Sequence, residues 1–411
     1  MKKLTIQNLK MAYIPIRMLR VLSFLLFLAP VVLFAQDESV ILLGKKDSLY
    51  SEVLKEHRPY WISLPNSYED TTASPQHYPV LVLLDARRNF QLAAGVVPFM
   101  SRNAQIPEMI IVAIPNTDRI RDLTPTYTLS GYEEAIDSSF TNSGGGDQFL
   151  KFLEDELLKE IDQSYRTMPF RILVGHSLGG TLACYAYLSR NKAFNAYIAT
   201  DPSLWWDRQT LVEQAKSDRT HQQPFQSSLY ISAAHHTMHT LDNSHMRKTQ
   251  EAFFVALEEK GKKPLRVKFQ HFEEEDHGTV PLSSLYHGLL FAFEGYHMPM
   301  DLIVKSEPEE INQHYEKFSK QVGVNFYPSE SEMKLYADFY FYRTKEKNKG
   351  LAFYQMNVDN YPASYRAHQY LADALREMDQ LEKAMRHYKR SLELNPDNEV
   401  VKKAISNLNT E

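Results

Sequence analysis

A buried strand runs directly into a glycine-flanked serine and then into an apolar helix between residues 171 and 190. The segment reads RILVGHSLGGTLACYAYLSR, and its centre is a Gly-x-Ser-x-Gly pentad at residues 175–179. Small residues two positions before and after the serine allow a sharp strand-to-helix turn that exposes the hydroxyl. Because strand, pentad and helix coincide, we interpret Ser177 as a nucleophile rather than as a polar residue in an ordinary glycine turn.

Strand and helix patterns alternate from about residue 37 to residue 298. Several strand patterns are continuous apolar runs, which are typical of parallel strands covered by helices on both faces. The predicted strands lie at residues 59–65, 78–86, 108–116, 170–176, 194–202, 228–235 and 265–272. We therefore predict an α/β fold with a mostly parallel central sheet.

A histidine that can activate the serine follows the last predicted strand. A serine hydroxyl is a weak nucleophile until a base accepts its proton. In strand–turn–helix hydrolases the base comes last in chain order, and the stretch KFQHFEEEDHGTVP (residues 268–281) places His277 in the expected loop. We predict His277 as the base. His271 lies within the strand and is interpreted as structural, and His176 is expected to shape the turn.

The acid that would orient the base is less clearly marked. Chain order requires it between the serine and the base, usually just past the strand at residues 228–235. Asp242 in the stretch HHTMHTLDNSH is the nearest carboxylate there and is our prediction. Glu251 and Asp201 stay open as alternatives, and so does a bare serine–histidine dyad.

Two backbone N–H groups are needed to hold an oxyanion. We predict that one belongs to Leu178, the residue after the nucleophile, and that the other comes from Ala86 or Arg87 after the strand at residues 78–86. Trp205 and Trp206 follow another strand at the same edge of the sheet. Adjacent tryptophans there suit an aromatic substrate pocket or an ordinary core role.

The net charge and the histidines bear on two other classes, nucleic-acid-binding and metal-binding proteins. The net charge of −5 provides no electrostatic footprint for nucleic acid. Four histidines lie in the loop at residues 235–245, and imidazole is a common metal ligand. No carboxylate or thiolate set completes a metal site there, so we predict no metal and no cofactor, and a solvated or substrate-facing loop.

The N-terminal residues have the pattern of a secretory signal. An arginine at residue 20 precedes an apolar run at residues 21–34, and the small residue Ala35 follows it. The run is shorter than the roughly 20 residues that a membrane span needs. We predict a cleaved signal peptide over residues 1–35, with an uncleaved anchor as the alternative. The mature chain is then periplasmic or extracellular, with no stable membrane span.

Beyond residue 298 the strand patterns end. Residues 299–330 are charged and predict a helical linker, and residues 331–411 predict a small all-α domain. Residues 365–398 form a 34-residue unit whose apolar and small positions match a tetratricopeptide repeat. A plain helical hairpin is the alternative. A protein partner could bind such a helical repeat.

The first domain resembles the esterase D branch of the α/β hydrolases, which includes enterochelin-esterase-like and feruloyl-esterase-like enzymes. The resemblance covers roughly residues 51–296. It rests on the stretches YPVLVLLDA, IPNTDRIRDLTP, GGGDQFLKFLEDELLKEIDQSYRT, GHSLGG, DPSLWW and DHGTVPLSSLYHGLLF. It implies an α/β-hydrolase fold with Ser177 as nucleophile, His277 as base, and Leu178 with the turn at residues 86–87 as oxyanion hole. The family often has glycine where Ala86 stands, and some members lack a clear acid.

These features predict a serine esterase that hydrolyses carboxylic esters through an acyl-enzyme. Small-molecule substrates of three kinds are compatible with the resemblance: siderophore, phenolic and short acyl esters. The alternative is a catalytically retired hydrolase scaffold whose helical extension binds a protein partner. A serine peptidase is disfavoured, because the chain carries no additional propeller or lid domain.

Overall fold

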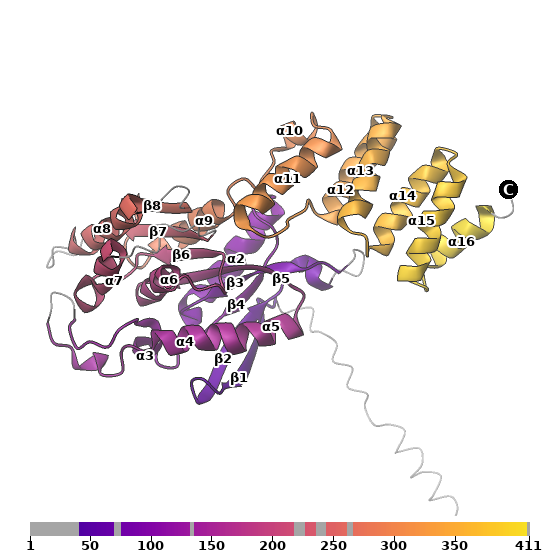
Figure 1. Cartoon of the computed structure of the whole chain (residues 1–411). Coiled ribbons are helices and arrows are strands. Elements are labelled where there is room, and N and C mark those ends of the chain that lie inside the picture. Colours follow the sequence, from indigo (N-terminus) through magenta and orange to yellow (C-terminus); the bar gives the residue numbers. More distant parts are fainter. Residues whose placement is uncertain are drawn as a thin grey trace, which may run out of the picture. The chain divides into compact units, whose positions relative to one another are not determined.

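The computed structural model describes residues 41–69, 75–131, 135–217, 227–235, 244–260 and 266–408. The predicted signal peptide lies outside these residues. Within the described part, eight strands form one sheet in the order β1-β2-β4-β3-β5-β6-β7-β8 (Figure 1). The strands are β1 (Lys45–Ser51), β2 (Glu56–Ser63), β3 (Tyr78–Leu83), β4 (Ile110–Ala113), β5 (Thr167–His176), β6 (Ala196–Thr200), β7 (Ser228–Ala234) and β8 (Arg266–Phe272).

The sheet is parallel from β4 through β3 to β8, while β1 and β2 form an antiparallel hairpin at one edge. The predicted mostly parallel α/β sheet is confirmed. Strand β1 was not predicted, because its sequence KKDSLYS is polar and most of its residues are exposed. An antiparallel edge hairpin does not need the continuous apolar run by which buried parallel strands are found in a sequence.

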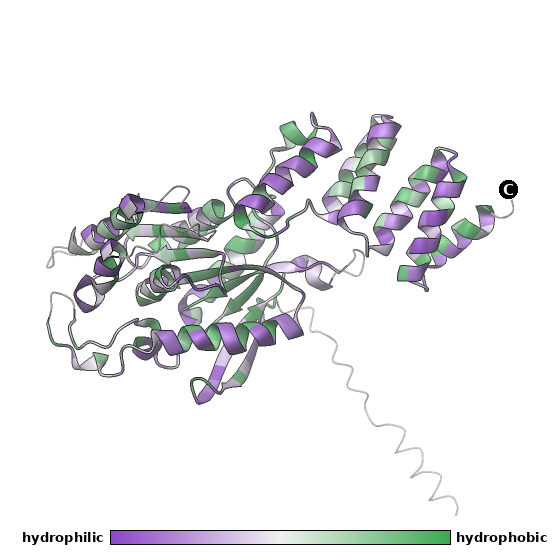
Figure 2. Ribbon diagram, in the orientation of Figure 1, coloured by the Kyte–Doolittle hydropathy of each residue, from purple (hydrophilic) through white to green (hydrophobic). Residues whose placement is uncertain are grey.

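Helices cover both faces of the sheet. Residues of α2 and α9 pack on one face, and residues of α4 to α8 pack on the other. Alternate side chains of β3 divide between the two cores, with Leu81 on the first side and Val82 on the second. In Figure 2 the central strands are mostly hydrophobic and the helices carry hydrophilic stripes, as this layering requires. The helices are α2 (Ala86–Arg102), α3 (Arg119–Leu123), α4 (Gly146–Phe152), α5 (Leu158–Ser164), α6 (Leu178–Leu188), α7 (Trp206–Ser217), α8 (Ser244–Lys260) and α9 (Val280–Ala292).

The carboxyl ends of neighbouring strands meet at one edge of the sheet. The last residue of β5, His176, pairs with Thr200 at the end of β6, and Thr200 pairs with Ser232 near the end of β7. Loops that follow these strands therefore begin side by side. In open α/β sheets such loops form the ligand site.

The residues after α9 are helical, as predicted, and α14 and α15 occupy the predicted 34-residue unit. The helices are α10 (Met300–Ile303), α11 (Pro308–Val322), α12 (Glu330–Asp338), α13 (Lys347–Asn360), α14 (Tyr365–Glu377), α15 (Leu381–Leu394) and α16 (Glu399–Leu408). Across the described ranges, no helix combines the length and the apolar character that spanning a membrane requires.

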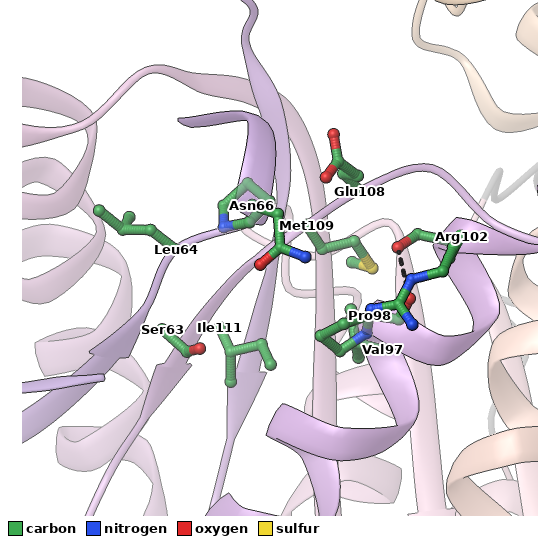
Figure 3. A pocket seen from close by; sticks show the side chains of 11 residues that line it. Ser63, Leu64, Asn66, Val97, Pro98, Arg102, Glu108, Met109 and Ile111 are labelled. Atoms are coloured by element: carbon green, nitrogen blue, oxygen red, sulfur yellow. Dashed lines mark hydrogen bonds between the residues drawn. The ribbon is translucent and has the colours of Figure 1, made fainter. Parts of the chain in front are cut away.

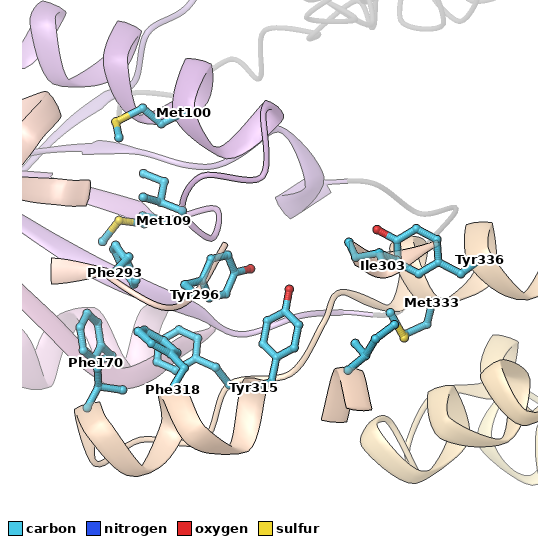
Figure 4. Packing of buried hydrophobic residues seen from close by; sticks show 14 of the residues in the cluster. Met100, Met109, Phe170, Phe293, Tyr296, Ile303, Tyr315, Phe318, Met333 and Tyr336 are labelled. Atoms are coloured by element: carbon cyan, nitrogen blue, oxygen red, sulfur yellow. The ribbon is translucent and has the colours of Figure 1, made fainter. Parts of the chain in front are cut away.

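Aromatic side chains join α11 to the sheet. The ring of Phe318 in α11 lies 6.3 Å from that of Phe293 and 5.6 Å from that of Tyr296 (Figure 4). It lies 5.1 Å from the ring of Phe326. Phe326 in turn contacts Phe170 of β5 at 5.4 Å. One buried cluster thus continues from the sheet into the helical extension. The domain boundaries at residues 298 and 330 stay predictions, and the described core runs across both.

We expect that Phe318→Ala lowers the free energy of unfolding by about 3–5 kcal/mol, because it opens a cavity at the centre of this cluster. Because the core is continuous, the sheet and the extension should unfold in one transition. Chemical denaturation followed by tryptophan fluorescence and far-ultraviolet circular dichroism measures both. Leu335→Ala removes an exposed side chain of α12 and is the matched control. Two separate transitions in the parent protein would contradict a shared core.

Candidate active site

Ser177 occupies a strained turn between β5 and α6. Its backbone has φ 60° and ψ −118°, a conformation that a residue with a side chain rarely adopts. The flanking glycines allow the turn to close, because a Cβ on Gly175 would lie 2.1 Å from the carbonyl oxygen of Gly179. The Ser177 N–H donates to the Thr200 carbonyl at 2.9 Å, which ties the turn to β6. The local structure is that of a nucleophile elbow.

His277 lies in the loop after β8, and its Nδ1 is 2.6 Å from Oδ2 of Asp201. Asp201 follows β6 directly, and its side chain is fully buried, whereas 39% of the His277 side chain is exposed. A carboxylate bound to Nδ1 fixes the tautomer in which Nδ1 carries a proton and Nε2 is free to accept one. The pair therefore has the arrangement of an oriented general base.

The pairing favours Asp201, which the sequence left as an alternative acid. The predicted acid, Asp242, lies outside the described residues. Glu251 pairs instead with Arg247 on the surface of α8 at 3.3 Å. The carboxylate of Asp276 accepts the N–H groups of the two residues after His277 and stabilises the loop. Asp201 could have been found in the sequence, because it stands directly after a strand whose end lies at the catalytic edge.

A second histidine lies against the base. The ring of His176 is 4.4 Å from that of His277, and His176 directly precedes the nucleophile. Burial lowers the pKa of His176 to about 4, and the neighbouring His277 and Arg88 act in the same direction. His176 is therefore neutral at physiological pH. It brings the base loop against the elbow, in keeping with its predicted structural role.

The predicted oxyanion donors lie in the first turns of two helices. Leu178 begins α6, and the turn at Ala86 begins α2. The Ala86 N–H donates to the Ile114 carbonyl at 3.1 Å, so the N–H of Arg87 is the donor that this turn leaves for a ligand. Preorganised donors of this kind stabilise developing negative charge.

An ion pair holds the two donor-bearing turns together. Arg119 donates from Nε to Oδ1 of Asp85 at 2.7 Å and from Nη2 to the His176 carbonyl at 3.2 Å. Asp85 immediately precedes α2 and has a positive φ of 55°. Arg119 thus connects the turn before α2 to the nucleophile elbow.

The two tryptophans differ in their surroundings. Trp206 is 1% exposed, donates its indole N–H to the Thr126 carbonyl at 3.2 Å, and packs against Phe140. It has the core role that the sequence left open. Trp205 is only partly buried and remains the candidate for a substrate contact. Ser203 was not predicted, and its hydroxyl oxygen lies 3.2 Å from that of Ser177.

A separate cavity lies away from this chemistry. It has a volume of about 140 Å³ and is bounded by Ser63 at the end of β2, by Ile111 of β4, and by Arg102 of α2 (Figure 3). Because β2 is antiparallel to β4, Ser63 stands beside the amino end of the parallel strands. The cavity therefore lies at the edge of the sheet opposite Ser177.

The described residues contain no group of three or more histidine, cysteine or acidic side chains arranged to hold a metal ion. His236 and His239 of the histidine-rich loop lie outside the described residues.

Comparison with known proteins agrees with the fold. Residues 51–274 match the family model "Putative esterase", and residues 365–398 match a tetratricopeptide repeat. The ferri-bacillibactin esterase BesA of Bacillus subtilis is 30% identical over 265 residues, which cover 60% of this chain and 89% of that enzyme.

Solved structures extend the comparison. An IroE-like serine hydrolase from Shewanella oneidensis superposes with a TM-score of 0.67 at 28% identity, covering 76% of this chain and 98% of the other. An uncharacterised protein from Capnocytophaga ochracea shares the fold over 90% of this chain and all of its own, with a TM-score of 0.56 at 17% identity.

The protein is thus an α/β-hydrolase enzyme that acts on carboxylic esters. The chain belongs to the putative esterase family, and it carries a C-terminal tetratricopeptide-like extension.

We expect Asp201→Asn to lower kcat by about 10²- to 10⁴-fold, because an amide at this position no longer stabilises the protonated base. Steady-state hydrolysis of p-nitrophenyl acetate measures the effect. Glu251→Gln is the control and should stay within about twofold, since Glu251 pairs with Arg247 at the surface and exposed ion pairs contribute little. If Asp242→Asn abolishes turnover while Asp201→Asn does not, the His277–Asp201 pair is not the functional one.

Proposed function

We propose that the enzyme hydrolyses ester bonds of a siderophore through a Ser177–His277–Asp201 triad. The observation that carries the mechanism is the Nδ1–Oδ2 hydrogen bond of 2.6 Å between His277 and Asp201, beside a serine in an elbow conformation. Support for the substrate class comes from the relationship to the ferri-bacillibactin esterase, which extends over 89% of that enzyme.

In the proposed reaction these groups act one after another. His277 Nε2 accepts the hydroxyl proton while Ser177 Oγ bonds to the ester carbonyl carbon. The N–H groups of Leu178 and Arg87 hold the oxyanion. His277 then donates the proton to the departing alcohol oxygen, which leaves an acyl group on Ser177. Water repeats the sequence with His277 as base and releases the carboxylic acid and the free serine.

The buried acid suits both steps. Asp201 stays ionised beside His277 and stabilises the imidazolium that forms at each proton transfer. His176 remains uncharged against the same ring, so it adds no positive charge that would oppose imidazolium formation. Its low pKa keeps this contact neutral at physiological pH.

The substrate proposal is tested by incubating the chain from Gln36 with enterobactin or bacillibactin, in iron-free and ferric forms. We expect the parent enzyme to open the ester linkages, and Ser177→Ala to lose about 10³-fold or more of the rate. Liquid chromatography with mass spectrometry detects the products. Hydrolysis of p-nitrophenyl acetate without any hydrolysis of the siderophores would overturn the substrate class and leave the esterase mechanism standing.

We further propose that the protein is exported after removal of residues 1–35. Support comes from the basic, apolar and small-residue pattern that precedes Gln36. The intact mass of the chain recovered from a periplasmic or culture fraction tests this, since the proposal requires an N-terminus at residue 36.

A second function, protein binding by the extension, is favoured by a groove of about 700 Å³ between α13, α14 and α15. Leu351 and Ala352 provide accessible apolar surface from α13, while Leu371 and Leu375 of α14 also line the groove but are almost fully buried. Lys383, Arg386 and Arg390 line it from one face of α15, and none of the described residues that line the groove is acidic. Apolar surface under three cations fits an acidic, leucine-containing segment of a partner protein.

A fluorescein-labelled peptide of alternating glutamate and leucine tests this groove by anisotropy. Arg386→Glu should weaken binding by about tenfold or more through charge reversal. Lys402→Glu reverses a charge on α16 outside the groove and should change binding less than twofold. Equal binding by both variants, or no binding of the peptide at low salt, would contradict the assignment.

A further inference from the structure

A buried amide from α8 contacts the triad acid. Gln250 is fully buried, and its Nε2 donates to Oδ1 of Asp201 at 2.9 Å. The N–H of Ala234 donates to the same oxygen at 3.1 Å, while Oδ2 faces His277. Donors thus approach both carboxylate oxygens, which is the condition for keeping a buried carboxylate ionised.

The orientation of the amide is determined by its acceptors. Nε2 of Gln250 also donates to the Pro202 carbonyl at 3.0 Å. If the amide were rotated by 180°, Oε1 would face Oδ1 of Asp201 and the Pro202 carbonyl, and neither group has a proton to donate. Oε1 instead points away from both and has no hydrogen-bond partner among the described residues. Nε2 of Gln250 therefore makes both of its donor contacts, while Oε1 is left without a hydrogen bond to any described residue.

The backbone conformation of Asp201 makes these hydrogen bonds important for holding its carboxylate in place. Asp201 has a φ of 40°, in the left-handed region that residues with side chains seldom occupy. It is followed by Pro202, which has no N–H to donate back to the turn. The position of the carboxylate is thus over-determined by contacts from β7, α8 and the base loop. An amide supplies this support without adding a charge that would neutralise the acid.

We propose that Gln250 is a positioning residue for catalysis: it fixes the Asp201 carboxylate so that Oδ2 stays aligned with Nδ1 of His277. The inference rests on the proposed triad. It assigns to α8 a part in the reaction that acts through the contact of Gln250 with Asp201.

Two substitutions test the inference. Gln250→Leu removes the donor at similar volume, and we expect kcat to fall by about 10- to 100-fold, the scale of an ångström-level misplacement, with KM within about twofold. Gln250→Glu keeps the shape but donates to Asp201 only while its own carboxyl is protonated. Because a like charge and burial both raise the pKa of such a carboxyl, activity of this variant should fall as pH rises through that pKa.

Thr249→Val is the matched control. Thr249 is its buried neighbour on α8, and its hydroxyl donates to the Met246 carbonyl rather than to the triad. Kinetic constants of Thr249→Val should stay within about twofold of the parent. Thermal unfolding of all variants shows whether a loss of rate reflects a loss of folded protein.

A double-mutant cycle separates positioning from general packing. If Gln250 acts through Asp201, then Gln250→Leu should cost less than about twofold in an Asp201→Asn background. Full additivity of the two losses, or kcat of Gln250→Leu equal to that of Thr249→Val, would overturn the inference. Retention of activity by Asp201→Asn alone would instead overturn the triad on which the inference rests.

Discussion

The parallel pairing of β5, β6 and β7 is the constraint on which the site depends. It aligns His176, Thr200 and Ser232 in one row, so that the residues directly after β5 and β6 are Ser177 and Asp201. The register also supplies the carbonyl of Thr200 that accepts the Ser177 N–H. The strained elbow and the buried acid are therefore held by backbone hydrogen bonds of the sheet. Only the base reaches the site from a longer loop.

In the proposed triad, charges are arranged so that one ionised pair forms during each proton transfer. Asp201 is buried with donors on both oxygens, and His277 is partly exposed beside it. The second ring at the site, His176, is kept neutral by burial. A proton taken from the serine thus produces a single imidazolium next to a single carboxylate. Low dielectric surroundings strengthen that attraction compared with water.

The local patterns of the sequence predicted the catalytic scaffold well. Apolar runs identify buried strands and the glycines around Ser177 identify the turn, because each of these signals lies within a few residues. Chain order predicts His277 as the base, and this role stays a prediction. The sequence narrowed the second oxyanion donor only to the turn at residues 86–87, since the Ala86 N–H is bonded to the carbonyl of Ile114, which directly follows β4. Strand β1 has too little apolar content to be recognised.

The features that the sequence did not predict depend on contacts between segments far apart in the chain. The chain-order rule allowed several carboxylates, and only the meeting of the β6 end with the base loop distinguishes Asp201. Burial of Trp206 depends on Phe140, more than 60 residues earlier in the chain. The packing of Phe318 on Phe293 and Phe326 makes the helical extension continuous with the core. The residue pattern of α11 alone does not indicate which side chains Phe318 packs against.

Covalent labelling of the nucleophile tests the central claim most directly. A fluorophosphonate probe should add once to the parent enzyme, on the peptide that contains Ser177, and Asp201→Asn should slow the labelling by about 10²-fold or more, because the base is no longer oriented. Peptide mass spectrometry and the rate of probe incorporation give both results. A probe attached to another residue, or labelling at the same rate without Asp201, would contradict the triad.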